Sequence, residues 1–304
     1  QRLLAFRVLY LQGSFFMAIF ARCIIFLSRK MHKAGFVNII GNPNVGKSTL
    51  MNALVGEKLS IITSKAQTTR HRIMGIVNGE DFQIVYSDTP GILKPAYKLQ
   101  ESMMNFVQGA VDDADVILYV TDTVEQSDRS ESIIEKINRS GIPTIVVINK
   151  IDLTTPQQLE ILAAQWQERI PEAVIIPVSA KEKVGMTGVL SAILERLPEG
   201  EPFYPKDTLT DKTLRSFASE IIREKILLNY EKEIPYCCEI EIDSYKEEPN
   251  IDRISATIYV ARQSQKGIVL GHKGERLKRV GQKAREDMEQ LLGKKVFLQL
   301  FVKV

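Results

Sequence analysis

The chain of 304 residues is long enough for two domains, each with its own hydrophobic core. Its formal net charge of +3 hides a polarity, because residues 251–304 hold 12 Lys and Arg against 5 Asp and Glu, while the central part of the chain is acidic. The basic C-terminal end indicates a bound polyanion, although a solvated charged face would account for the charge alone. Three cysteines, two of them adjacent, exclude a disulfide framework and a cysteine metal site and indicate a reducing compartment.

Residues 1–30 differ in composition from everything that follows. They contain five basic and no acidic residues, and the basic residues flank an apolar stretch over residues 8–21. A membrane-spanning helix needs roughly 20 apolar residues, so this stretch is short for that role. A signal peptide, an arginine-rich transit peptide and a peripheral membrane anchor are the functional interpretations. Because Met31 stands just before the first predicted core strand, we expect residues 1–30 to be a non-native or targeting extension outside the fold.

A phosphate-binding loop follows the first predicted strand, residues 36–40. The loop has the pattern G-x-x-x-x-G-K-S, and an apolar helical pattern begins directly after it, which is the context that a true match requires. The two glycines let successive backbone N–H groups point at one anion at a helix N-terminus. Lys47 is expected to reach the β- and γ-phosphates of a nucleotide, and Ser48 to ligate Mg²⁺. The predicted nucleotide-binding residues of this loop are Gly41, Asn42, Asn44, Val45, Gly46, Lys47, Ser48 and Thr49.

Strand and helix patterns alternate from residue 36 to about residue 197. Residues 73–77 and 82–87 flank Asn78-Gly79, the strongest short signal for a β-hairpin. This alternation predicts an α/β domain with a mostly parallel sheet, helices on both faces and one antiparallel edge strand. Later strands are predicted at residues 116–120, 144–148 and 174–178, and helices at residues 99–111, 129–139, 157–169 and 184–197.

The sequence D-T-P-G at residues 88–91 follows the strand predicted at residues 82–87. The carboxylate of Asp88 can hold Mg²⁺ through water at that strand end, and the backbone N–H of Gly91 can meet a γ-phosphate. Taken alone, these residues could form an ordinary turn. Their place downstream of a phosphate loop favours the nucleotide site, with Thr89 among its binding residues.

The sequence N-K-I-D at residues 149–152 ends a predicted buried strand and indicates guanine as the base. The carboxylate of Asp152 can accept hydrogen bonds from both N1–H and the 2-amino group of guanine, a donor pair that adenine lacks. Asn149 and Lys150 are expected to brace the site. The next strand ends in S-A-K, which can offer a backbone N–H to the guanine O6. Alone this tripeptide is no evidence, and it supports the assignment only because it follows the other three motifs in order. Its residues are Ser179, Ala180 and Lys181.

Residues 197–205 form the one convincing linker, with three prolines, a glycine and no apolar periodicity. Beyond it, Asp211 can cap a helix, and residues 236–242 alternate as a strand with Cys238 buried and Cys237 exposed. A partner strand, two short helices and a final strand complete the order α-β-β-α-α-β, an α+β domain. We expect a first domain at residues 33–198, a linker at 199–210 and a second domain at 211–304.

A G-x-x-G loop lies between the two short helices of the second domain. This is the loop with which KH domains let an RNA backbone approach two helices closely. A four-residue G-x-x-G pattern often occurs by chance in protein sequences. Its position between two helices and the basic residues around it make this match more significant. Phosphate contacts would hold the RNA strand, and an adjoining groove would read the base edges. The predicted RNA-binding residues are Lys266, Gly271, His272, Lys273, Gly274, Arg276 and Lys278, with Arg279 nearby.

In this order the motifs resemble the translation-factor-related class of small GTPases, and residues 35–304 resemble the Era family of bacterial ribosome-assembly GTPases. The resemblance also rests on Q-T-T-R at residues 67–70 and S-E-I-I-R-E-K at residues 219–225. It implies a Ras-like P-loop GTPase domain followed by a type II KH domain. In such GTPases a switch-one threonine ligates Mg²⁺ and senses the γ-phosphate, and we choose Thr69 over Thr68. The implied catalytic residues are Lys47, Thr69 and Gly91, and the implied Mg²⁺ ligands are Ser48, Thr69 and Asp88.

The resemblance further implies that the protein binds GTP or GDP and the 3′ end of small-subunit ribosomal RNA, and acts in assembly of the small ribosomal subunit. It implies a cytoplasmic monomer, with peripheral association at the inner face of the cell membrane as a further expectation. Ile92 stands where many GTPases place a water-orienting glutamine, so we expect slow intrinsic turnover. Asn44 matches an asparagine that holds K⁺ in potassium-stimulated relatives, and equally suits a residue that keeps the loop's shape. Residues 1–30 and the end of the chain at Val304, where family members usually continue into a basic tail, depart from the family pattern.

Two other functions are alternatives. A membrane-associated regulatory GTPase would need several spanning helices, and only residues 1–30 offer an apolar stretch. A non-catalytic RNA-binding adaptor with a vestigial nucleotide fold is opposed by the intact Lys47, Ser48, Asp88 and Asp152.

Overall fold

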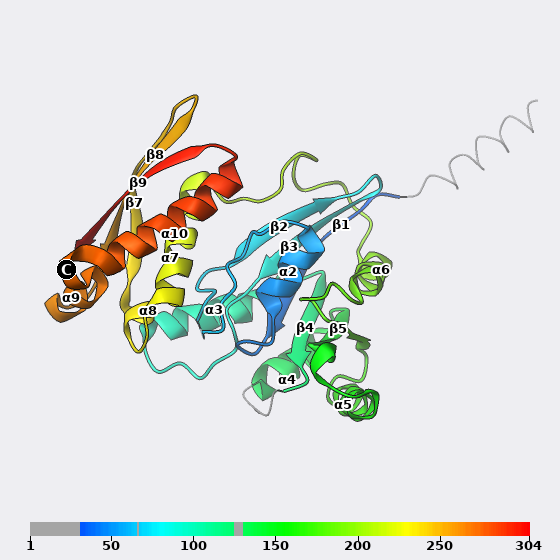
Figure 1. The fold of residues 1–304 in the computed structure, drawn as a ribbon. Coiled ribbons are helices and arrows are strands. Elements are labelled where there is room, and N and C mark those ends of the chain that lie inside the picture. Colours follow the sequence, from blue (N-terminus) through cyan, green and yellow to red (C-terminus); the bar gives the residue numbers. More distant parts are fainter. Residues whose placement is uncertain (1–30, 66, 125–129) are drawn as a thin grey trace, which may run out of the picture.

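The structure is a computed structural model that describes residues 31–65, 67–124 and 130–304 (Figure 1). The expectation for residues 1–30 and the first residue of the helix expected at 129–139 lie outside the described residues. Two sheets, one of six and one of three strands, organise the described part of the chain. No helix within this part combines the length and the apolar character needed to cross a membrane.

The larger sheet consists of β1 (Lys33–Gly41), β2 (Ile73–Asn78), β3 (Phe82–Asp88), β4 (Val116–Asp122), β5 (Thr144–Asn149) and β6 (Val174–Pro177). Its strand order is β2-β3-β1-β4-β5-β6. The edge strand β2 runs antiparallel to β3 and the other pairs are parallel, which confirms the sheet expected from the sequence. All seven residues of β4 are buried, as expected for a strand that is covered on both faces.

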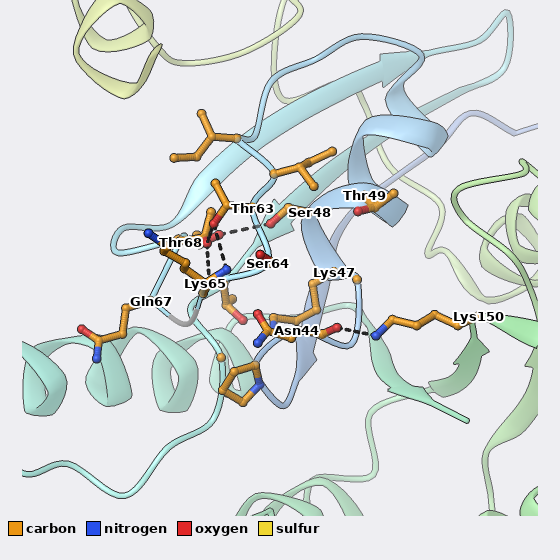
Figure 2. Close-up of a pocket in the computed structure, with 17 residues that line it drawn as sticks. Asn44, Lys47, Ser48, Thr49, Thr63, Ser64, Lys65, Gln67, Thr68 and Lys150 are labelled. Carbon is orange, nitrogen blue, oxygen red and sulfur yellow. Dashed lines mark hydrogen bonds between the residues drawn. The ribbon is translucent and has the colours of Figure 1, made fainter. Parts of the chain in front are cut away.

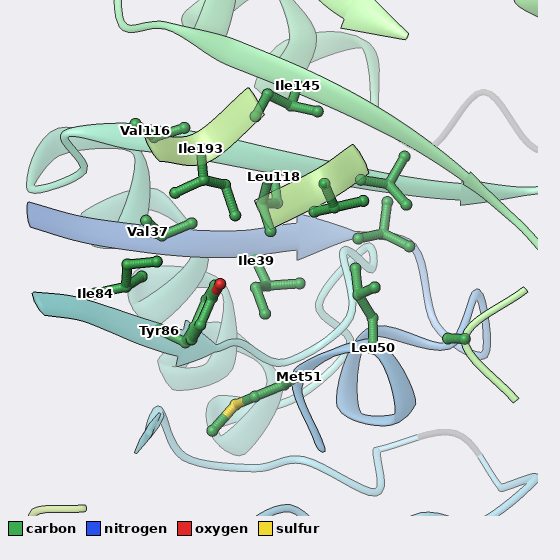
Figure 3. Packing of buried hydrophobic residues seen from close by; sticks show 14 of the residues in the cluster. Val37, Ile39, Leu50, Met51, Ile84, Tyr86, Val116, Leu118, Ile145 and Ile193 are labelled. Carbon is green, nitrogen blue, oxygen red and sulfur yellow. The ribbon is translucent and has the colours of Figure 1, made fainter. Parts of the chain in front are cut away.

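Helices cover both faces of this sheet. One face packs against α2 (Lys47–Val55) and α6 (Met186–Arg196), and the other against α3 (Lys98–Asp112), α4 (Glu131–Ser140) and α5 (Pro156–Arg169). Figure 3 shows the first face, where Ile39 of β1 and Tyr86 of β3 meet Leu50 of α2. Fully burying a side chain such as Leu50 stabilises the fold by about 1.5–3 kcal/mol. The core therefore fixes the position of the first turn of α2, where the phosphate loop ends.

The segment between the two sheets lies against the β2–β3 edge. The side-chain oxygen of Gln83 accepts hydrogen bonds from the backbone N–H of Phe203 at 2.7 Å and of Tyr204 at 3.0 Å. The N–H of Ile76 donates to the carbonyl of Leu209 at 2.8 Å. The next helix, α7 (Leu214–Asn229), is capped by Thr213, whose side chain accepts from the N–H of Ser216. The prediction that Asp211 caps this helix is wrong, because the observed cap, Thr213, lies two residues after Asp211.

The smaller sheet consists of β7 (Glu239–Glu247), β8 (Ile251–Tyr259) and β9 (Lys295–Lys303), in the order β7-β8-β9. The first pair is antiparallel and the second parallel. One face of this sheet packs against α7, α9 (Gln263–Leu270) and α10 (Glu275–Leu292). Figure 1 shows α7 and α10 between this sheet and the larger domain.

The strand that we predicted at residues 236–242 begins too early. Ile234–Cys237 form the short helix α8, in which Pro235 occupies an early position where its fixed φ suits a helix. The observed order is therefore α-α-β-β-α-α-β. Cys238 is buried as predicted and Cys237 is half-buried. The final helix α10 has 18 residues, so the prediction of a short helix is also wrong there.

Candidate active site

The phosphate loop of residues 41–49 lies between β1 and α2, where the sequence predicts it. Gly46 has a φ of 95°, and a Cβ there would lie 2.3 Å from Nδ2 of Asn149, so only glycine fits. The same Nδ2 donates to the carbonyl of Val45 at 2.9 Å and ties the loop to the end of β5. Lys47 is buried, and its ammonium donates to the carbonyl of Asn42 at 2.8 Å, across the loop. The loop borders a cavity of about 360 Å³, lined also by Asn44, Ser48 and Thr49.

Figure 2 shows the cavity from close by. Lys150 reaches Asn44 on one side of Lys47, while Thr63 and Thr68 lie on the other side. The two walls of the cavity therefore come from different parts of the chain, the guanine motif on one side and the loop after α2 on the other.

Ser48 and Thr69 line one end of the cavity, and the fully buried Asp88 lies directly against both. The Ser48 hydroxyl donates to Oδ2 of Asp88 at 2.6 Å, and Oγ1 of Thr69 lies 3.1 Å from the Ser48 oxygen and 3.3 Å from the same carboxylate oxygen. The hydroxyl of Thr68, by contrast, makes its hydrogen bonds inside its own loop, where it donates to the carbonyl of Lys65 at 2.6 Å. Of the two threonines, Thr69 is thus the one beside the carboxylate.

Burial dominates the electrostatics of Asp88. The residue has no exposed surface, and burial raises the pKa of its carboxyl, although Lys47 and neighbouring hydroxyl groups act in the opposite sense. Its Oδ1 has no hydrogen-bond partner within the described part of the chain. An ionised carboxylate in this position calls for a cation, and three oxygen ligands of this kind suit Mg²⁺. The residues present therefore fit the metal that the sequence predicts.

Thr89 and Gly91 of the D-T-P-G segment line the same cavity. The hydroxyl of Thr89 donates to the carbonyl of Ile39 at 2.7 Å, and a Cβ on Gly91 would lie 2.8 Å from Pro43 of the phosphate loop. Ile92 is 1% exposed and packs into the core beside α3, away from the cavity. Of the residues 88–92, Asp88 alone carries an ionisable group.

The guanine motif connects three loops through one amide. The side-chain oxygen of Asn149 accepts from the N–H of Lys150 at 2.8 Å and of Ala180 at 3.0 Å, while its nitrogen holds the phosphate loop. Asp152 lies exposed, and its carboxylate accepts from the Ser179 hydroxyl at 2.6 Å. This hydrogen bond lowers the pKa of Asp152 and so favours the ionised carboxylate, the form in which it could accept from a guanine.

Lys150 and Lys181 differ in their surroundings. The ammonium of Lys150 donates to the carbonyl of Asn44 at 2.7 Å and forms an ion pair with Asp122, a partner that the motif did not indicate. Lys181 is exposed and pairs with Glu182 at 3.4 Å. Lys150 thus braces the phosphate loop as expected, whereas the ion pair of Lys181 is with its neighbour Glu182.

The G-x-x-G loop lies between α9 and α10, with residues 272–274 forming the short 3₁₀ helix η2 (His272–Gly274). Gly271 and Gly274 have positive φ values of 70° and 80°, so the chain reverses sharply before α10 begins. The basic side chains around the N-terminus of α10 face solvent, and Lys266 on α9 is half-buried. The exposed residues are His272, Lys273, Arg276, Lys278 and Arg279.

Comparison with known proteins identifies the family. Residues 36–150 match a family described as 50S ribosome-binding GTPase, and residues 233–304 match the KH domain. A GTPase Era from Staphylococcus haemolyticus (strain JCSC1435) is 44% identical over 275 residues, which cover 90% of this chain and 92% of the relative. This chain belongs to the Era family of GTPases. A GTPase Era from Syntrophus aciditrophicus (strain SB) is also 44% identical, over 277 residues that cover 90% of each chain.

Two solved Era structures resemble this one over the same share of the chain. Each has a TM-score of 0.86 and 41% identity, and covers 90% of this chain and 94% of the other. One is Aquifex aeolicus Era bound to GDP·AlF4⁻, and the other is Era in complex with MgGDPNP and nucleotides 1506–1542 of 16S ribosomal RNA. The Era resemblance and the GTPase-plus-KH architecture that the motifs predict are thus confirmed, and the chain is a GTPase.

Motif reasoning missed the residues that join the two domains. Arg70 and Arg223 lie inside the quoted motifs without an assigned role, and both side chains are almost fully buried where the two domains meet. The only sequence signal was their place in the Q-T-T-R and S-E-I-I-R-E-K segments.

Proposed function

We propose that this Era-family protein is a Mg²⁺-dependent GTPase that binds small-subunit ribosomal RNA near its 3′ end and acts in small-subunit assembly. One observation carries the proposal: a single chain combines a preformed phosphate and guanine site with an exposed basic G-x-x-G loop at the N-terminus of a helix. The Era complex with MgGDPNP and a 16S ribosomal RNA fragment, at 41% identity, supports the same two ligands here.

In this proposal each site residue has a role that follows from its position. Lys47 neutralises the β- and γ-phosphate charge, while Ser48, Thr69 and Asp88 hold Mg²⁺. The metal, when bound, neutralises charge that develops on the phosphate oxygens. Asp152 selects guanine, and the N–H of Gly91 meets the γ-phosphate. Because no side chain at residues 88–92 can orient the attacking water as a glutamine does, turnover relies on positioning and is slow.

We make a more specific proposal for the same site, namely that a monovalent cation binds there. None of the described residues that line the cavity is an arginine, so no arginine finger is supplied from within this part of the chain. Asn44 borders the cavity with a φ of 64°, and we propose that it helps to hold K⁺ beside the phosphates. Turnover should be faster in potassium chloride than in matched sodium chloride, and equal turnover would rule this role out.

We also propose that residues 33–198 and 211–304 are separate domains joined by 199–210, because their buried residues form separate clusters. The protein is proposed to be a cytoplasmic monomer whose contact with the inner face of the cell membrane is peripheral. Sedimentation and cell fractionation test these points. A membrane-integrated pool or a stable dimer would contradict them.

The central experiment crosslinks the protein to RNA in cells and then repeats the binding with purified chain in GTP or GDP. We expect recovery of the 3′ end of small-subunit ribosomal RNA, and tighter binding of that fragment than of an unrelated RNA of equal length. Recovery of other RNAs alone, or equal binding of both fragments, would overturn the assignment of the RNA.

A further inference from the structure

The loop that carries Thr69 is fastened to the KH domain by its next residue. We use the term switch-one loop for residues 63–70, of which residues 63–65 and 67–70 are described. The side chain of Arg70 is only 3% exposed. Its guanidinium donates to backbone carbonyls at Cys238, 3.0 Å away, and at Pro235 and Tyr236, each 3.2 Å away. These acceptors belong to α8 and the residue after it, in the KH domain.

The KH domain holds the same loop at two further points. The guanidinium of Arg223 on α7 donates to the carbonyl of Thr68 and is itself paired with Glu220. The ammonium of Lys65 donates to the carbonyl of Tyr230, just after α7. Loop and KH domain thus exchange hydrogen bonds in both directions, and most of the acceptors are backbone carbonyls. Contacts of this kind depend on where the helices lie rather than on particular acceptor side chains.

Adjacent residues of the loop therefore contact different domains. Thr69 contacts Ser48 and Asp88 at the metal end of the cavity, and Arg70 contacts the KH domain. Arg72, two residues later, offers a comparison. Its guanidinium contacts residues of the GTPase domain alone among its described partners: Ser87, Asn38 and Asp113.

The surroundings of Arg70 disfavour its charge in part. Burial lowers the pKa of Arg70, the nearby Arg223 lowers it further, and Glu239 and Glu220 oppose both. Glu239 is 70% exposed, so water weakens its compensation. Two desolvated guanidinium groups of like charge make the docked arrangement less stable than its hydrogen bonds alone suggest.

We propose that Arg70 is a positioning residue for the magnesium end of the active site: by fastening the switch-one loop to α8 of the KH domain, it keeps the Thr69 hydroxyl beside Ser48 and Asp88. The inference rests on the proposed role of Thr69 as a Mg²⁺ ligand. Since linkage is reciprocal, a docked KH domain favours binding of Mg²⁺ with GTP, and bound Mg²⁺·GTP favours the docked KH domain.

The test measures the Mg²⁺ concentration needed for half-maximal binding of a non-hydrolysable GTP analogue by the full chain. Arg70→Ala should raise this concentration by about tenfold, within the usual range of couplings between sites. Arg70→Lys should give an intermediate value, because an ammonium can reach fewer carbonyls at once. Arg72→Ala is the matched control and should stay within about twofold, because its contacts do not reach the KH domain. Binding of GDP without Mg²⁺ should not change in any of these variants.

Thr69→Ala separates this inference from the proposed function. If Thr69→Ala leaves the Mg²⁺ requirement unchanged, the ligand role of Thr69 fails, and the positioning role of Arg70 fails with it. If Thr69→Ala raises the requirement while Arg70→Ala behaves like Arg72→Ala, only the positioning role is overturned.

Arg223→Gln provides a second approach from the KH side, should Arg70→Ala lose its fold as judged by circular dichroism. It removes the contact to the carbonyl of Thr68 without altering the GTPase domain. A raised Mg²⁺ requirement in this variant supports the inference. An unchanged requirement in a folded Arg223→Gln protein overturns it.

Discussion

The phosphate loop and the switch-one loop border the same cavity but are held in different ways. The phosphate loop is fixed from within the GTPase domain, by Asn149 at Val45 and by Lys150 at Asn44. The switch-one loop depends on partners such as Cys238, which lies 168 positions away from Arg70 in the sequence. We therefore expect phosphate and base recognition to be local properties of one domain, whereas we propose that the metal end is shared between two. Changes in the KH domain should therefore affect Mg²⁺-dependent steps more than nucleotide recognition.

Lys47→Ala should have the largest effect and tests the local side of this comparison. Loss of a buried charge at the phosphates should cost about 2–5 kcal/mol of binding free energy, or roughly 30-fold to several thousand-fold in GTP affinity. Isothermal titration with GTP measures the loss. RNA binding without nucleotide should stay at the wild-type level, since the KH core is separate. A variant that also loses RNA binding would contradict the separation of the two sites.

Asp152→Asn tests base recognition within the same domain. The amide replaces an acceptor by a donor, so affinity should move from GTP towards xanthosine triphosphate, whose C2 carbonyl can accept from the amide. The preference should change by roughly 100-fold, in line with sites that hydrogen-bond their substrate. The fold should survive, because the remaining amide oxygen can still accept from Ser179. Competition binding checks the prediction, and an unchanged preference for GTP would refute the assignment of Asp152.

Gly274→Asp tests the distant end of the KH domain. A Cβ at this position meets no atom within 4 Å, so the substitution adds a negative charge at the RNA loop and some backbone strain. Filter retention should show RNA affinity reduced by about tenfold, from the lost approach of a phosphate. GTP turnover without RNA should stay near the wild-type rate.

Gly293→Asp is the matched control for that variant. Gly293 ends α10, has a φ of 66° and also has open space at the Cβ position. The same strain and charge are thus introduced at the opposite end of an 18-residue helix, about 27 Å away. If both variants bind RNA equally, the KH loop does not contact RNA, and the basic end of the chain is a solvated face.

Asp88→Asn should have the smallest effect, on stability. Because burial raises the pKa of Asp88, its stabilising contribution is greatest at low pH, where the carboxyl is protonated, and is lost as pH rises through the raised pKa. An uncharged amide avoids this cost at neutral pH. The nucleotide-free variant should melt higher, by an amount on the order of 1 kcal/mol or roughly 2–4 °C. A lower melting temperature in scanning calorimetry would show that the carboxylate is better compensated than its environment suggests.

Sequence patterns predicted the elements that depend on local chemistry. The apolar runs of β1 and β4, the Asn78-Gly79 hairpin and the glycines of the phosphate loop each carry their own physical signal. The same reasoning failed at residues 234–237, where a short helix interrupts an alternating pattern that favoured a strand.

The docking of Arg70 was beyond sequence reasoning for a different reason. Its acceptors are backbone carbonyls, which every residue carries, so no pattern of side chains marks them. The place of Thr69 beside Ser48 and Asp88 could be chosen from the motif. The contacts that hold Thr69 in this place join residues that are far apart in the sequence, so they can be seen only in the folded structure.

Amide hydrogen exchange of the two loops, measured in one sample, tests the central contrast most directly. The full chain is bound to Mg²⁺ and a GTP analogue, and wild type is compared with Arg70→Ala and Arg72→Ala. We expect Arg70→Ala to lose protection in peptides ending at residue 70 and to keep it in peptides over residues 41–49. Arg72→Ala should change neither. Equal loss in both loops, or no loss at the switch-one loop, would contradict this contrast.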